Sequence, residues 1–149
     1  MIIVEPNTPT HPDAVRLLDA SQALMQEIFA DEENFALDHA ALAAPDIRFF
    51  TARDGATLLG CGAMQIKDGY GEVKSFYVSP AARGKGVGAA LIRQIEDQAR
   101  DEGLSVLNLE TGDELAAACR LYERHGFTRC GPFGEYEDNG SSVFMTKTL

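Results

Sequence analysis

A glycine-rich segment in the middle of the chain carries residues suited to binding an anion. From Val78 to Gly88 it reads Val-Ser-Pro-Ala-Ala-Arg-Gly-Lys-Gly-Val-Gly, so glycines occupy positions 84, 86 and 88. Glycines at alternate positions expose successive backbone N–H groups and let a ligand approach without hindrance from a Cβ atom. The helix expected to follow directs its positive dipole end to the same place, and Arg83 and Lys85 add positive side chains. We therefore predict a cradle for an anionic group such as a pyrophosphate.

The spacing of this segment differs from that of two common glycine loops. The phosphate loop of NTPases needs Gly-x-x-x-x-Gly-Lys followed by Ser or Thr, whereas here Gly86 follows Lys85. The dinucleotide fingerprint needs Gly-x-Gly-x-x-Gly after the first strand of a βαβ unit. Here the glycines are spaced Gly-x-Gly-x-Gly, and the segment lies in the middle of the chain. A turn that only caps a helix is the alternative interpretation of the glycines taken alone, and a nucleotide-phosphate binder is a further one.

The elements around this segment are expected to alternate between strands and helices. Apolar spacing and turn residues predict helices over about residues 10–28, 38–43, 87–103 and 113–125. They predict strands over residues 2–4, 47–52, 56–66, 72–78, 105–109, 127–130 and 142–148. Because a helix separates strand 72–78 from strand 105–109, these two are expected to pair in parallel. We expect an α+β fold with one mixed, mostly antiparallel sheet of about six to seven strands, flanked on both faces by about four helices.

The helix after the glycine segment illustrates the expected packing. Its apolar face repeats every fourth residue, at Val87, Leu91, Ile95 and Ala99. The opposite face is charged and consists of Arg93, Glu96, Asp97, Arg100 and Asp101. Glycines 60 and 62 lie within strand 56–66, where they predict a bulge or a close backbone approach. The core is expected to include phenylalanines at positions 29, 35, 49 and 50.

The overall composition limits the class of protein. The 149 residues are expected to form one domain over residues 1–149, and 45% hydrophobic with 24% charged residues is typical of a soluble globule. The formal net charge of −10 repels phosphate backbones and anionic membranes and attracts protonated amines. The three cysteines, Cys61, Cys119 and Cys130, have no metal-ligand spacing and are expected to be reduced, buried thiols. With no signal-peptide pattern at Met1, we expect a cytoplasmic protein that binds neither nucleic acid, membrane nor metal.

Two segments together resemble the GNAT superfamily of N-acetyltransferases. The first is Arg83-x-x-Gly86-x-Gly88, preceded by the strand 72–78. The second is Leu121-Tyr-Glu-Arg-His-Gly-Phe127. The likeness spans residues 60–127. The C-terminal segment resembles that of bacterial members whose acceptor is poorly defined. It implies the GNAT fold and a soluble, acetyl-CoA-dependent N-acetyltransferase in which an amine attacks the thioester directly, in a ternary complex.

The resemblance also implies roles for individual residues. Backbone N–H groups of the loop would hold the pyrophosphate of acetyl-CoA, through Arg83, Gly84, Lys85, Gly86, Val87 and Gly88. The strand before the loop would pair with the pantetheine arm through Phe76, Tyr77 and Val78. The two strands beside that arm would splay to admit the thioester. Tyr122 would protonate the departing thiolate, or else serve as a core aromatic residue. No metal is implied.

A primary amine is protonated at neutral pH, so the reaction needs a group that accepts a proton. A partly buried carboxylate suits this role, because burial raises its pKa toward neutrality. Glu72 resembles the general-base glutamate of some family members, and we favour it. Glu110 is the rival, because it directly follows strand 105–109 and would border the same site. A solvated strand-end carboxylate is the alternative interpretation of Glu72.

The sequence departs from the family at Leu115, where many members place an Asn or Gln that contacts the cofactor. The C-terminal segment is expected to form a rigid loop near the acceptor, with Tyr136 or Glu135 facing the substrate. The acceptor is expected to be a small-molecule amine or a peptide-like amino group. A catalytically silent acyl-CoA-binding module is the alternative function. Homodimers occur in this family, and the C-terminal strands offer an edge at which two chains could pair.

Overall fold

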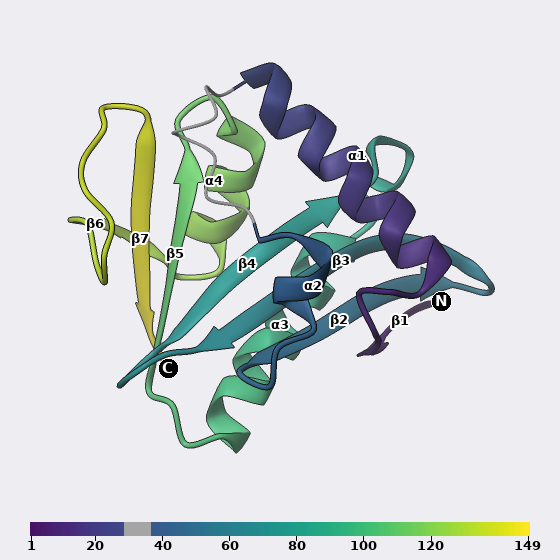
Figure 1. The fold of residues 1–149 in the computed structure, drawn as a ribbon, viewed down its shortest axis with the longest axis horizontal. Coiled ribbons are helices and arrows are strands. Elements are labelled where there is room, and N and C mark those ends of the chain that lie inside the picture. Colours follow the sequence, from purple (N-terminus) through teal and green to yellow (C-terminus); the bar gives the residue numbers. More distant parts are fainter. Residues whose placement is uncertain (29–36) are drawn as a thin grey trace.

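The computed structural model describes residues 1–28 and 37–149, and these form one seven-stranded sheet with helices on both faces (Figure 1). The strand order is β1-β2-β3-β4-β5-β7-β6. The strands are β1 (Ile2–Pro6), β2 (Ile47–Asp54), β3 (Thr57–Ile66), β4 (Gly71–Val78), β5 (Val106–Gly112), β6 (Thr128–Cys130) and β7 (Ser142–Thr148). All neighbours are antiparallel except β4 and β5, which are parallel. The predicted fold class and the parallel pair are confirmed.

Within residues 1–28 and 37–149, four α-helices cover the sheet. They are α1 (Pro12–Ile28), α2 (His39–Leu42), α3 (Val87–Asp101) and α4 (Ala116–Arg124), and a 3-10 turn, η2 (Pro80–Ala82), precedes the glycine loop. Figure 1 shows α1 and α2 on one face and α3 and α4 on the other. Each face has its own hydrophobic cluster, one joining α1 and α2 to the sheet and the other joining α3 and α4 to it. The sheet therefore separates an α1/α2 face from an α3/α4 face.

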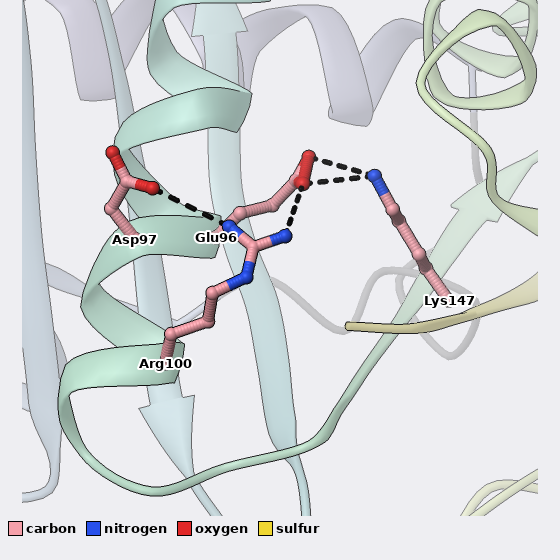
Figure 2. Close-up of polar contacts among 4 residues, drawn as sticks. All are labelled: Glu96, Asp97, Arg100 and Lys147. Carbon is pink, nitrogen blue, oxygen red and sulfur yellow. Dashed lines mark hydrogen bonds and ion pairs between the residues drawn. The ribbon is translucent and has the colours of Figure 1, made fainter.

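The packing of α3 follows its apolar periodicity, with one exception. Val87, Leu91, Ile95 and Ala99 are all at most 1% exposed, as predicted. Glu96 belongs to the charged face, yet it is only 5% exposed and lies beside Lys147 of β7 (Figure 2). A helix-face pattern records which residues lie together on the helix, but it does not show which cation a distant strand brings to that face.

Close backbone approach explains the glycines of β3. A Cβ atom on Gly60 would lie 2.8 Å from the Tyr77 carbonyl oxygen, and one on Gly62 would lie 3.1 Å from the Phe76 ring. The register between β3 and β4 shifts at Gly62, which is the predicted bulge. On β4 the same irregularity places Ser75 in the left-handed region, at φ 50°. A bulge bends its strand, so β4 changes direction at this point.

That change of direction separates β4 from β5. Their parallel register runs through three pairs and ends at Val73 and Leu109. Beyond it, Lys74–Val78 and Glu110–Gly112 run apart, and Figure 1 shows the two arrowheads pointing in different directions. We call these two segments the β4/β5 divergence. It supplies the splayed strand pair that the sequence resemblance implied.

Some predictions about single residues differ from the structure. Cys61 and Cys119 are buried free thiols, but Cys130 is exposed on the short edge strand β6, so its predicted burial was wrong. Phe49 and Phe50 are buried as predicted, whereas Phe29 and Phe35 lie outside the described residues. Helix α4 begins at Ala116 rather than residue 113, because Leu115 N–H closes a turn onto the Gly112 carbonyl. Within the described ranges, no helix combines the length and apolarity that a membrane crossing requires.

Candidate active site

The glycine loop has the backbone geometry that an anion cradle needs. Gly84 and Gly86 have φ angles of +79° and +83°, a region that residues with side chains rarely adopt. The position of a Cβ atom on either residue has no heavy atom within 4 Å, so the loop is open in front of these residues. Gly86 directly precedes α3 and offers no side chain to cap its first N–H groups. These N–H groups are therefore left for another acceptor.

Electrostatics at the loop favours a negatively charged ligand. The N-terminus of the 15-residue helix α3 carries the positive end of its dipole. Arg83 and Lys85 flank Gly84 and are both exposed. A pyrophosphate fits this donor set, since it accepts several N–H groups at once and is anionic. Local backbone groups and two cations thus oppose the net charge of −10.

Gly88 lacks a side chain for a different structural reason than Gly84 and Gly86. It lies in the first turn of α3, and a Cβ atom there would lie 2.7 Å from Leu121 Cδ2 of α4. The absence of a side chain therefore lets α3 and α4 pack closely. Val87 beside it is buried in the α3/α4 core.

The strand residues Phe76, Tyr77 and Val78 lie on the β4 arm of the divergence, beyond the last pair with β5. On the other side of β4, Tyr77 pairs with Cys61 and Val78 pairs with Gly60 of β3. The edge of β4 directed toward β5 is thus outside the β4–β5 ladder along these residues. An extended ligand chain can pair with such an edge in the manner of an added strand.

Tyr122 lies in the α3/α4 core, close to the divergence. It is 4% exposed, and its ring contacts Phe76 and Phe127 edge-on at centroid distances of 5.6 and 5.8 Å. Burial raises the pKa of its phenol, and the negative charge of Glu110 adds to the rise. A phenol with a raised pKa retains its proton at neutral pH and can serve as a donor.

Glu72 is a buried carboxylate rather than a solvated one. Its side chain is 3% exposed. Its Oε2 atom accepts a hydrogen bond of 2.6 Å from the Tyr136 hydroxyl and lies 3.1 Å from Lys74 Nζ. Lys74 Nζ also donates to the Tyr136 oxygen at 2.8 Å, which closes a triangle of three polar groups. Lys74 is a site residue that the sequence analysis did not single out, although its position two residues after Glu72 places it on the same strand face.

Glu110 is the second carboxylate at this site. Register places Glu72 opposite Asn108, and Glu110 follows Asn108 by two residues, so both carboxylates belong to one face of the sheet. That face is opposite the core formed by Val73 and Leu109 with α3. The Ser142 hydroxyl donates to Glu110 Oε2 at 2.7 Å. Burial raises the pKa of the Glu110 carboxyl to about 7, and the Glu72 charge adds to the rise.

An aromatic cluster borders the two carboxylates. Phe133 contacts the rings of Tyr70, Tyr136 and Phe144 at centroid distances of 5.7, 5.2 and 5.8 Å. Phe144 of β7 stands opposite Glu110 in the strand register. The loop between β6 and β7 (residues 131–141), which we call the C-terminal loop, therefore packs over this face and brings Tyr136 to Glu72. Glu135, its predicted alternative, is exposed.

Two further observations concern Leu115 and possible metal ligands. Leu115 lies in the turn just before α4 and is partly exposed. Because it is a leucine, this position offers no polar side chain to a cofactor. Over residues 1–28 and 37–149, the structure contains no group of three or more His, Cys, Asp or Glu side chains arranged to hold a metal ion.

Comparisons with known proteins identify the family. The sequence model of the acetyltransferase (GNAT) family matches residues 14–127. The "IAA acetyltransferase" of Azospirillum brasilense is 42% identical over 150 residues, which cover 99% of this chain and 98% of that protein. A Klebsiella pneumoniae crystal structure assigned to the acyl-CoA N-acyltransferases superposes with a TM-score of 0.84 at 30% identity, covering 100% and 98% of the two chains. The PaiA N-acetyltransferase of Thermoplasma acidophilum, solved with coenzyme A, shares the fold at a TM-score of 0.76 and 16% identity, with 100% and 99% covered.

Proposed function

This chain belongs to the GNAT family of acetyl-CoA-dependent acetyltransferases, and we propose that it transfers the acetyl group to a primary amine by direct attack in a ternary complex. The observation that carries the proposal is the β4/β5 divergence, with the glycine loop at one end and two carboxylates near the other. This arrangement can hold an anionic carrier and present its thioester next to a proton acceptor.

The residues of the loop and of β4 fit the two parts of coenzyme A. The N–H groups from Arg83 to Gly88 would hold the pyrophosphate, because Gly84 and Gly86 leave open space in front of them. The β4 edge at Phe76, Tyr77 and Val78 would pair with the pantetheine arm. When bound, acetyl-CoA supplies an activated acyl thioester.

Two residue types would move protons. Tyr122 would donate a proton to the departing sulfur, since its raised pKa keeps the hydroxyl protonated. A carboxylate would take the proton of the amine, and both Glu72, which the sequence favours, and Glu110 lie on the face opposite α3. No metal takes part in this scheme.

The acceptor is proposed to be a small amine or a peptide-like amino group. The net charge of −10 supports a cationic acceptor, because an acidic protein raises the local concentration of protonated amines. The buried thiols Cys61 and Cys119 are compatible with our proposal that one domain over residues 1–149 works in the cytoplasm. The short edge strand β6 is the place where a second copy would pair if the protein forms homodimers.

Release of free thiol from acetyl-CoA in the presence of a panel of primary amines tests the proposal. The panel should include diamines, amino acids, an aminoglycoside and peptides with free N-termini. We expect at least one amine to give acetylated product together with equal thiol. Binding of acetyl-CoA without thiol release for any amine would instead support the silent acyl-CoA-binding module.

A further inference from the structure

The two carboxylates on the face opposite α3 have unlike surroundings. We propose that Glu110 receives the proton of the acceptor amine, and that Glu72 is a positioning residue that orders Tyr136 and Lys74 around it. This inference rests on the proposed function, because it assigns roles within the same site. It reverses the preference that the sequence suggests.

Glu72 is already engaged by two donors. Its Oε2 atom accepts from the Tyr136 hydroxyl at 2.6 Å and lies 3.1 Å from the Lys74 ammonium, and the whole side chain is 3% exposed. Both donors hold the carboxylate in one orientation. A proton arriving on that oxygen would have to displace them, together with the packing of the C-terminal loop that carries Tyr136. This environment suits a side chain that orders its neighbours.

Glu110 is placed differently. It is the first β5 residue beyond the last pair with β4, so it lies where the two strands begin to part. It is partly rather than fully buried, and it accepts a hydrogen bond of 2.7 Å from the neutral Ser142 hydroxyl. The charge of Glu110 also contributes to the raised pKa of Tyr122.

The charged and polar groups around Glu110 make it a base matched to neutral pH. Burial raises the pKa of its carboxyl to about 7, the Ser142 hydroxyl and the Lys74 ammonium oppose this rise, and the Glu72 carboxylate adds to it. On α4 and on the loop between β6 and β7, the pKa values of the Tyr122 and Tyr136 phenols are raised by burial and also by the Glu110 charge. A general base is most effective when its pKa lies near the working pH.

The proton balance of the reaction is complete with these groups. The ammonium gives its first proton to Glu110, and from there it passes to solvent. The freed nitrogen forms a bond to the acetyl carbon as the bond from that carbon to sulfur breaks. Tyr122 gives a proton to the sulfur, and the second proton of the nitrogen replaces it through solvent. The products are the acetylated amine, a free thiol and one proton.

The test compares Glu110→Gln and Glu72→Gln over a range of pH. Gln at position 110 keeps an oxygen for Ser142 but loses the basic group. Glu5→Gln is the matched control, because Glu5 pairs with Arg53 at the far edge of the sheet. For the amine that the wild type uses fastest, kcat/KM is measured by thiol release at pH values from about 5.5 to 9, a range that brackets the expected base. Calorimetric titration with acetyl-CoA shows whether each variant keeps its binding site.

We expect the wild-type kcat/KM to fall below a pH of about 7. Glu110→Gln should lose about 100-fold at pH 8 and lack this inflection. Glu72→Gln should keep the inflection at a lower pH, because a negative charge near Glu110 is gone. Glu110→Asp should regain part of the rate together with an inflection, and it serves if the Gln variant does not fold. An unchanged profile in Glu110→Gln, or loss of the inflection in Glu72→Gln, would overturn the assignment. A wild type inactive toward every amine would overturn the proposed function, and with it the role of Glu110.

Discussion

The Lys147 ammonium donates to both carboxylate oxygens of Glu96, at 3.1 Å to Oε1 and 2.8 Å to Oε2 (Figure 2). The contact joins the middle of α3 to the end of β7, and the Glu96 side chain is 7% exposed. Arg100 lies 3.7 Å from the same carboxylate but is half exposed. The pair thus ties the helix that begins at the glycine loop to the strand beside β5.

This pair should contribute to stability. Lys147→Met would leave Glu96 buried beside the more distant Arg100, so we expect a loss of about 2 kcal/mol in the free energy of unfolding. Arg100→Met is the matched control and should cost less than about 0.5 kcal/mol, because that cation is solvent-screened. Urea unfolding at pH 7 measures both. Equal losses would show that Glu96 does not depend on Lys147, and the double variant Glu96→Gln/Lys147→Met should recover part of the loss.

The geometry of Gly86 should matter for coenzyme A binding rather than for folding alone. Gly86→Ala places a side chain at a φ of +83° and should cost about 1 kcal/mol of stability. Gly103→Ala is a matched control at the other end of α3, with a φ of +77° and an equally open Cβ position. We expect similar thermal destabilisation in both, but at least about tenfold weaker coenzyme A binding in Gly86→Ala alone, since one tenfold step corresponds to about 1.4 kcal/mol. Equal affinities by calorimetry would argue against the cradle.

The hydroxyl of Tyr122 should be needed for turnover and not for binding. Tyr122→Phe keeps the edge-on contacts with Phe76 and Phe127 while removing the proton donor. We expect kcat to fall by about 100-fold, with the dissociation constant for acetyl-CoA changed less than about twofold. Steady-state kinetics and calorimetry measure the two quantities. A turnover equal to that of the wild type would leave Tyr122 as a core aromatic residue.

The pKa of Glu110 should also appear in the pH dependence of stability. Its folded-state pKa of about 7 lies above the ordinary value of 4.5. The contribution of this group to stability is therefore complete below about pH 4.5 and is lost as the pH rises through 7. Gln at this position does not titrate, so Glu110→Gln should gain in Tm relative to the wild type between about pH 5 and pH 8. A Tm difference that is the same at both pH values would contradict the raised pKa.

Local sequence determined much of the fold and one end of the candidate site. Apolar periodicity and turn residues predicted the seven strands and the two helical layers. These patterns suffice because each one depends only on the residues of its own element and on the face that this element buries. The glycine loop was equally local, since the backbone conformation of Gly84 and Gly86 depends on the absence of a Cβ atom in these residues themselves.

Long-range packing decided the other end of the site. Tyr136, 64 residues after Glu72, donates to it, and Ser142, 32 residues after Glu110, donates to that carboxylate. The same kind of distant contact buried Glu96 against Lys147, 51 residues away. The hydrogen-bond partners of a carboxylate and its burial depend on which elements pack around it. For Glu72 and Glu110 these partners come from β7 and from the loop between β6 and β7, so only the tertiary structure reveals their unlike surroundings.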